Sequence, residues 1–262
     1  MWPRAYYNQP MDSATARQLV ELNRQFYADF GKNFSATRQR IQPGVRKILF
    51  GLEGTERILD LGCGNGELAR TLAQTGFHGT YLGLDFSLPL LTDAESQPEG
   101  FLAAFHVADL TAEHWEDVIR NKKEEDPGDS PLFTSPFSLI TAFAVVHHIP
   151  SLAMRRSILQ KVRGLLEPDG KFIHSNWQFL NSEKLKARIQ PWSAANLSAA
   201  EVDEGDYLLD WRGGGAGLRY VHHFSAQELS QLAAETGFRV AEMFFSDGAE
   251  KNLGLYQVWS KI

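Results

Sequence analysis

The chain has 262 residues, of which 43% are hydrophobic, and this is enough to bury the core of one large α/β domain. The formal net charge of −6 argues against a protein that holds nucleic acid by bulk charge. Basic residues nevertheless outnumber acids between Arg4 and Lys47, where they form either a solvated helical face or a local basic surface.

The single cysteine, Cys63, excludes an intrachain disulfide and a multi-cysteine zinc site, so no structural metal is expected. The first residues resemble no secretory signal and the longest apolar stretch, 137–146, is about half a bilayer span, so we expect a soluble cytoplasmic protein with no membrane partner.

Two helices are predicted before the first strand. Asp12-Ser13 is a plausible N-cap for a helix whose apolar stripe, Leu19, Leu22, Phe26 and Phe30, stops at Gly31. A second, short helix is expected to begin at Pro43. Residues 1–52 thus form a helical extension, and residues 53–262 form the main domain.

From residue 56 onward, short apolar runs alternate with helical stretches, which predicts a doubly wound α/β fold whose seven-stranded sheet is mostly parallel. The expected strands are Arg57–Leu61, Thr80–Asp85, Ala103–Ala108, Ser138–Phe143, Lys171–Asn176, Val240–Ser246 and Leu255–Ser260. The expected helices follow Gly66 and Ser87 and cover Thr111–Lys122, Ser151–Leu166 and Ser225–Gly237, with a turn at Asp169-Gly170. Residues 124–136 are expected to be a surface loop without chemistry. An insertion before the sixth strand, about 180–217, is interpreted as a lid or recognition segment that is helical at first and then irregular.

A glycine-rich loop follows the first strand. Asp60 ends that strand, and Gly62, Gly64 and Gly66 occupy the turn into the next helix, where glycines let backbone approach a ligand closely. The dinucleotide fingerprint requires glycine at position 67, where this chain has Glu67, so the spacing disfavours NAD.

Two more acids, Asp85 and Asp109, follow the second and third strands. Because ligands bind at the carboxyl ends of parallel strands, Asp60, Asp85 and Asp109 are expected to converge on one crevice. Carboxylates there can accept hydrogen bonds from the ribose hydroxyls and the adenine amino group of a nucleoside.

This set of residues resembles the class I S-adenosylmethionine-dependent methyltransferases. The resemblance implies S-adenosylmethionine as the cofactor, with the glycine-rich loop at its methionine and sulfonium end, Asp85 at the ribose, and Asp109 with Leu110 at the adenine. The cofactor-binding residues implied are Asp60, Gly62, Cys63, Gly64, Gly66, Asp85, Phe86, Asp109, Leu110 and Phe143.

Two subclasses are disfavoured on chemical grounds. Methylation of pyrimidine C5 needs a cysteine nucleophile beside the substrate, and the only cysteine lies in the cofactor loop. Methylation of exocyclic amino groups in nucleic acid uses an Asn/Asp-Pro-Pro-aromatic turn, whereas residues 142–148 read Ala-Phe-Ala-Val-Val-His-His.

A narrower resemblance is to the tRNA wobble-uridine carboxymethyl methyltransferases. It is carried by Phe34-Ser-Ala-Thr-Arg38 with Pro43, by Val145-Val-His-His-Ile149 with Arg155-Arg156, by Leu165-Leu-Glu-Pro-Asp-Gly170 with Trp177, and by Leu218-Arg-Tyr-Val-His-His-Phe224. The chain departs from that family at Gln42, where the family has tryptophan. The resemblance implies O-methylation of a carboxylate on a modified tRNA nucleoside or a related small acid, and the family includes enzymes that need a small activating protein partner.

Candidate residues for the acceptor follow from this chemistry. A carboxylate needs cationic or hydrogen-bonding groups that orient one oxygen, and the candidates are Arg38, His148, Arg219 and His222. A hydroxyl acceptor would instead make His147 or His148 a base, and Tyr27, His147 and Trp177 are further substrate candidates. The alternatives that stay open are a biosynthetic methyltransferase acting on carbon, nitrogen or hydroxyl oxygen of a small molecule, and a non-catalytic cofactor-binding subunit. The histidines have a structural alternative at the rim of the sheet, and Arg38 has one as a bridge between helices.

Overall fold

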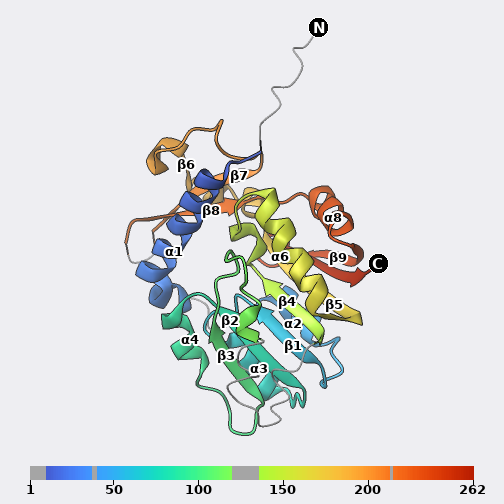
Figure 1. Ribbon diagram of the computed structural model, residues 1–262. Coiled ribbons are helices and arrows are strands. Elements are labelled where there is room, and N and C mark those ends of the chain that lie inside the picture. The colour runs from blue at the N-terminus through green and yellow to red at the C-terminus, as the bar shows by residue number, and fades with distance from the viewer. Residues whose placement is uncertain (1–9, 37–39, 120–135, 213–214) are drawn as a thin grey trace.

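The main sheet has seven strands in the order β3-β2-β1-β4-β5-β10-β9, and all are parallel except β10 (Figure 1). The computed structural model describes residues 10–36, 40–119, 136–212 and 215–262. The strands are β1 (Arg57–Leu61), β2 (Thr80–Asp85), β3 (Ala103–Val107), β4 (Phe137–Phe143), β5 (Leu166–Trp177), β9 (Phe238–Ser246) and β10 (Gly254–Lys261). The predicted doubly wound fold is therefore confirmed.

Helices cover both faces of this sheet because alternate strand residues point to opposite faces. Helices α2 (Pro43–Leu49) and α3 (Glu67–Gln74) pack on the face that carries Ile58, while α6 (Leu152–Leu165) and α8 (Ala226–Glu235) pack on the face that carries Leu59. Helix α4 (Leu88–Ala94) follows β2. Shorter helical turns are η2 (Val146–His148), η3 (Phe179–Asn181), α7 (Glu183–Lys186) and η4 (Trp192–Ala195).

Side-chain caps start three helices where the sequence predicted them. Asp12 accepts hydrogen bonds from the N–H groups of residues 14 and 15, Ser151 caps α6, and Ser225 caps α8. Helix α1 (Ser13–Ala36) runs five residues past the predicted end at Gly31. Gly31 is buried and packs close to Ser87 and Leu90, so this glycine serves helix packing instead of ending the helix.

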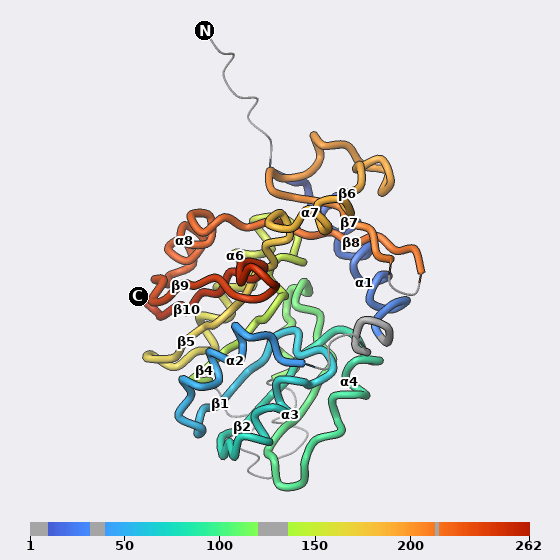
Figure 2. The backbone as a smooth tube through the Cα atoms, turned by 180° about the vertical axis from the view of Figure 1, so that it is seen from behind, coloured from blue at the N-terminus to red at the C-terminus, as the bar shows by residue number. Residues whose placement is uncertain are grey.

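A second, antiparallel sheet includes much of the segment that was predicted to be irregular, while its role as a lid or recognition element stays a prediction. Strands β6 (Ile189–Gln190), β7 (Asp206–Trp211) and β8 (Gly217–His222) lie in that order, and α1 packs along them (Figures 1 and 2). Leu19 of α1 shares a buried cluster with Leu208 and Tyr220. Helix α1 also contacts α4, so it spans from the second sheet to the main domain.

Two smaller differences concern segment ends. Residues 110–116 form turns and bends where a helix was expected from Thr111, and helical backbone is described only at 117–119. The remainder of that helix and the expected loop at 124–136 fall almost wholly outside the described residues. The turn expected at Asp169-Gly170 lies inside β5, which begins at Leu166 opposite Phe137, and the register shifts just after that pair.

Candidate active site

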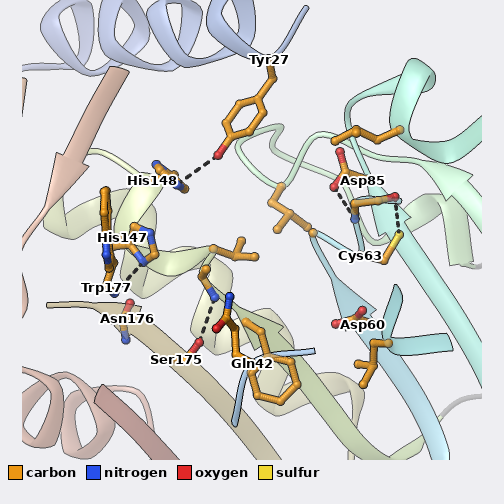
Figure 3. A pocket seen from close by; sticks show the side chains of 18 of the residues that line it. Tyr27, Gln42, Asp60, Cys63, Asp85, His147, His148, Ser175, Asn176 and Trp177 are labelled. Carbon is orange, nitrogen blue, oxygen red and sulfur yellow. Dashed lines mark hydrogen bonds between the residues drawn. The ribbon is translucent and has the colours of Figure 1, made fainter. Parts of the chain in front are cut away.

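A cavity of about 410 Å³ opens at the carboxyl ends of β1, β2, β4 and β5. The glycine-rich loop and the ends of β2 and β3 line one half, and α1, η2, the end of β5 and β8 line the other. Figure 3 shows Cys63 and Asp85 on the first side and Tyr27, His148 and Trp177 on the second. The sequence-predicted residues that line it are Tyr27, Asp60, Gly62, Cys63, Gly64, Asp85, Phe86, Asp109, Leu110, Phe143, His147, His148, Trp177 and Arg219. Arg38 lies outside the described residues.

The glycine-rich loop presents bare backbone to the cavity. Gly62, Gly64 and Gly66 have φ angles of 70°, 56° and 74°, a region that L side chains rarely adopt. A Cβ on Gly62 would lie 2.4 Å from Cγ2 of Val145, whereas a Cβ on Gly64 would meet nothing within 4 Å. Gly64 therefore leaves room for a ligand. Gly66 does not line the cavity, which corrects its expected place at the cofactor. A Cβ there would lie 2.9 Å from Ala94, so this glycine lets the start of α3 lie close to the end of α4.

Asp60 is a carboxylate at the floor of the cavity. It is 4% exposed, and it accepts hydrogen bonds from the Tyr81 hydroxyl at 2.5 Å and the Thr141 hydroxyl at 2.6 Å. Burial raises the pKa of Asp60 to about 6. The neighbouring Cys63 thiol also has a raised pKa because it is buried and lies near Asp85 and Asp60, so it is a packing residue and not a nucleophile.

Asp85 joins the glycine-rich loop to the end of β2. Its two oxygens accept the Gly64 N–H at 2.9 Å and the Ser87 N–H at 2.8 Å (Figure 3 shows the Gly64 bond). Burial nevertheless raises the pKa of Asp85. The exposed ring of Phe86 packs edge-on against Tyr27 of α1, with ring centroids 5.7 Å apart. Asp85, the candidate ribose ligand, is thus held in a fixed position relative to the glycine-rich loop.

Asp109 carries a contact that sequence reasoning missed. One of its oxygens accepts from the Thr111 N–H and hydroxyl, and the other pairs with the Arg24 guanidinium from α1. Arg24 also lines the cavity. No local signal marks this pair, because the two residues are 85 positions apart. Helix α1 is therefore part of the wall beside the adenine candidate.

These features fit S-adenosylmethionine. The open space at Gly64 admits close backbone contact, the buried acids Asp60 and Asp85 suit the ammonium, sulfonium and ribose groups, and Asp109 with Leu110 lies at the third strand end where adenine is expected. When bound, this cofactor supplies an electrophilic methyl group on a cationic sulfur.

The other half of the cavity holds two adjacent histidines with different surroundings. His147 is 1% exposed, and its Nδ1 accepts the Trp177 N–H at 3.4 Å. His148 is half-buried, with Nδ1 3.2 Å from the Tyr220 carbonyl oxygen and Nε2 3.2 Å from the Tyr27 hydroxyl. Figure 3 shows Tyr27 reaching down from α1 to His148. His148 and Tyr27 thus face each other in the half of the cavity opposite the glycine-rich loop.

Arg219 brings a buried positive charge to this half. It is 3% exposed, and its guanidinium carbon lies 4.8 Å from the Trp177 ring centroid, 5.6 Å from that of Phe26 and 5.9 Å from that of Trp211. Such cation–π contacts offset part of the cost of burying the charge. The cavity therefore has acids on the side of the glycine-rich loop and a cation on the opposite side, beside Trp177.

His222 lies outside the cavity, which corrects its expected contact with substrate. Side chains alternate along β8, so His222, three residues beyond Arg219, points to the opposite side. Its Nδ1 lies 2.6 Å from Asp206 and its Nε2 lies 2.8 Å from Glu228. Arg155 completes this buried charge network under the second sheet.

Within the described part of the chain, no helix combines the length and apolarity that crossing a bilayer requires. No group of three or more His, Cys, Asp and Glu side chains in that same part is arranged to hold a metal ion.

Comparisons with known proteins agree with this site. A family model described as a methyltransferase domain matches residues 27–243. A protein of Encephalitozoon cuniculi that is provisionally named a methyltransferase is 28% identical over 83% of this chain and 87% of its own length. The tRNA (carboxymethyluridine(34)-5-O)-methyltransferase ALKBH8 of Macaca fascicularis is 25% identical over 67% of this chain, which spans only 23% of that protein.

Among solved structures, a SAM-dependent methyltransferase of Methanosarcina mazei superposes with a TM-score of 0.59 at 19% identity, covering 85% of this chain and 98% of the other, and this similarity supports the fold. The match to the methyltransferase family model, together with the cavity, sets the non-catalytic alternative aside. With a family model covering most of its length and a cavity that fits the methyl donor, the chain belongs to the methyltransferase domain family and is an S-adenosylmethionine-dependent enzyme.

Proposed function

We propose that this enzyme transfers the methyl group to a carboxylate oxygen, carried by a modified uridine of tRNA or by a related small acid. The observation that carries the proposal is Arg219, a buried cation on the acceptor side of the cavity. A guanidinium in a dry site forms strong charge-assisted hydrogen bonds to a carboxylate. The similarity to ALKBH8, whose name states this chemistry on tRNA, supports the same acceptor class.

In this proposal Asp85 holds the ribose and Asp109 the adenine, while Asp60 faces the methionine end. Arg219 orients the acceptor carboxylate, and Trp177 forms the wall on which an acceptor ring stacks. An ordinary carboxylate is ionised at neutral pH, so no base is needed and the residues act by positioning.

The first experiment is isothermal titration with S-adenosylhomocysteine, followed by labelled methyl transfer to bulk tRNA and to a small-molecule extract. Label that enters tRNA or a small acid and is released by mild base, as an ester would be, supports the proposal. Base-stable label in either pool contradicts it. A salt-sensitive gel shift with tRNA separates the two acceptor pools, because phosphate contacts weaken with salt.

Arg219→Gln tests the role of the cation. We expect the KM for the acceptor to rise about 10- to 100-fold, as for a lost charged hydrogen bond, while affinity for S-adenosylhomocysteine stays within about twofold. Arg212→Gln is the matched control. Arg212 lies near the same hairpin, but it is exposed and pairs with Asp210. An unchanged KM in Arg219→Gln would exclude this residue from acceptor binding.

His148 favours a second candidate, a small-molecule methyltransferase acting on a hydroxyl. Its Nδ1 faces a carbonyl oxygen, so Nε2 is the acceptor that faces Tyr27 and the cavity, as a base requires. The two functions predict opposite pH dependence: a hydroxyl acceptor gains rate as the imidazole loses its proton, whereas a carboxylate acceptor gains from the imidazolium. The direction of the change in kcat/KM between about pH 5 and 8, where imidazoles ordinarily titrate, decides between them.

A further inference from the structure

Asn23, on the inner side of α1, connects that helix to two segments of the site. It is 6% exposed. Its Oδ1 accepts the Tyr220 N–H at 2.8 Å, and its Nδ2 donates to the Tyr220 carbonyl and to the His148 carbonyl, both at 3.2 Å. The Tyr220 N–H can only donate, which fixes the orientation of the amide and leaves its NH₂ group facing two carbonyl oxygens.

This contact closes the open edge of the second sheet. Tyr220 lies opposite Leu208 of β7, and its other neighbour is Asn23, whose side-chain amide takes the place that a further strand would have. The Tyr220 carbonyl is therefore held at a defined position. That carbonyl is the one that lies 3.2 Å from His148 Nδ1.

The Tyr220 carbonyl determines which nitrogen of His148 carries hydrogen. A carbonyl oxygen only accepts, so Nδ1 is the protonated nitrogen and, in a neutral ring, Nε2 is the acceptor. The Tyr27 hydroxyl, one helical turn after Asn23 on α1, then donates to Nε2. Both ring nitrogens of His148 are thus oriented by contacts that depend on α1.

We propose that Asn23 is a positioning residue for methyl transfer: it holds the Tyr220 carbonyl where it keeps His148 in the Nδ1–H form, with Nε2 directed to Tyr27 and the acceptor. This inference rests on the proposed function only in placing the acceptor beside His148. With a hydroxyl acceptor, the oxygen loses its proton to Nε2 as it gains the methyl group, and the donor becomes an uncharged thioether. With a carboxylate acceptor, the same geometry directs an imidazolium Nε2–H at one oxygen.

The test uses Asn23→Ala and Asn23→Asp. The first removes all three hydrogen bonds, and the second keeps the acceptor for the Tyr220 N–H but places an oxygen against the two carbonyls. Gln18→Ala is the matched control, because Gln18 is an amide on the same helix that donates to the Ala195 carbonyl at 2.7 Å and touches neither Tyr220 nor His148.

The primary readout is the pair of ring nitrogen-15 shifts of His148 in histidine-labelled full-length protein, assigned with His148→Gln. We expect the Nδ1–H form in the wild type and in Gln18→Ala, and a mixture of tautomers in both Asn23 variants. We expect kcat to fall about 10- to 100-fold in these variants, as for a misplaced catalytic contact, while affinity for S-adenosylhomocysteine changes less than about twofold.

An unchanged tautomer in folded Asn23→Ala overturns the proposal, whatever happens to the activity. A loss of kcat that only matches the unfolded fraction, measured by denaturation, also overturns it, because Asn23 would then serve stability alone. If the wild type methylates neither acceptor pool, the proposed function fails, but the nitrogen shifts still decide the positioning role of Asn23.

Discussion

The buried carboxylate of Asp60 makes the stability of the ligand-free enzyme depend on pH. Burial raises the pKa of Asp60 from an ordinary 3.8 to about 6. The folded chain therefore binds this proton more tightly than the unfolded chain, so the free energy of unfolding falls as pH rises from about 4 to 6 and levels off above that. The difference in pKa corresponds to about 3 kcal/mol.

Asp60→Asn removes this titration while keeping the shape of the side chain and one oxygen for the Tyr81 or Thr141 hydroxyl. We expect the variant to be more stable than the wild type at pH 8, by up to about 3 kcal/mol, and to lose this advantage near pH 4. The measurement is urea denaturation at a series of pH values without cofactor. Asp169→Asn is the matched control, because it removes the same charge from an exposed position.

A variant that is less stable than the wild type at pH 8, or that shows the same difference from it at every pH, would refute the reasoning. Affinity gives an independent result: if the Asp60 carboxylate faces the cationic methionine end, Asp60→Asn binds S-adenosylhomocysteine more weakly at pH 8. A gain in stability with unchanged affinity would leave the pKa argument intact and make the assignment of Asp60 to the cofactor wrong.

Three further changes test the loop, the strand exit and the core. Gly64→Ala places a methyl group in the open space of the cavity, at a residue whose φ is 56°. Calorimetry should show S-adenosylhomocysteine binding weakened at least about tenfold, and the protein should lose about 1 kcal/mol of stability. Unchanged affinity would contradict the role of the bare backbone. Ala144→Gly removes the strain of a non-glycine residue with a φ of 58°, directly after β4. Thermal unfolding should show a gain of about 0.5–1 kcal/mol in the free energy of unfolding. A lower Tm would argue against strain there. Burial lowers the pKa of His174 to about 3 from 6.5, so the wild type loses stability as pH falls below 6.5, by up to about 1.4 kcal/mol per pH unit. His174→Leu should show a shallower slope between pH 6.5 and 4.5, and parallel slopes would count against this source of acid sensitivity.

The strand ends of the main sheet could be predicted because their signals are local. Strands β1 and β2 have the bounds that the sequence predicted, since each is an apolar run with an aspartate as its last residue or the one before it. Parallel topology then brings Asp60, Asp85 and Asp109 to the same edge. The cofactor half of the cavity therefore follows largely from the sequence.

The second sheet could not be read in the same way. Both faces of β7 and β8 are covered, by α1 on one side and by Phe179 on the other, so their apolar residues show no simple alternation with polar ones. The glycines at 213–215 suggested an irregular segment. Because β8 was not recognised as a strand, nothing showed that Arg219 and His222 point to opposite sides.

The polar side chains of α1 were also beyond sequence reasoning. The apolar stripe of this helix was recognised, but its polar residues contact distant parts of the chain. Asn23 contacts residues at least 125 positions away, and Arg24 contacts a residue 85 positions away. Such contacts depend on where the helix docks. The basic N-terminal segment is accordingly not only a solvated face, since Arg24 pairs with Asp109 and Lys47 with Glu242.

The distribution of charge also constrains how Arg219 can serve a carboxylate acceptor. Transfer of a methyl group from a sulfonium to a carboxylate removes a positive and a negative charge together. A cation bound tightly to the attacking oxygen would stabilise the reactants more than the transition state, and only stronger binding of the transition state raises the rate. Arg219 is held at the wall by Trp177 and Phe26, on the acceptor side of the cavity. Its best use, and that of a His148 imidazolium, is on the oxygen that does not attack, which leaves the other oxygen free to face the methyl group. Arg219→Lys then separates charge from geometry: a point charge should preserve acceptor binding better than it preserves kcat, because it lacks the planar fork that orients one oxygen.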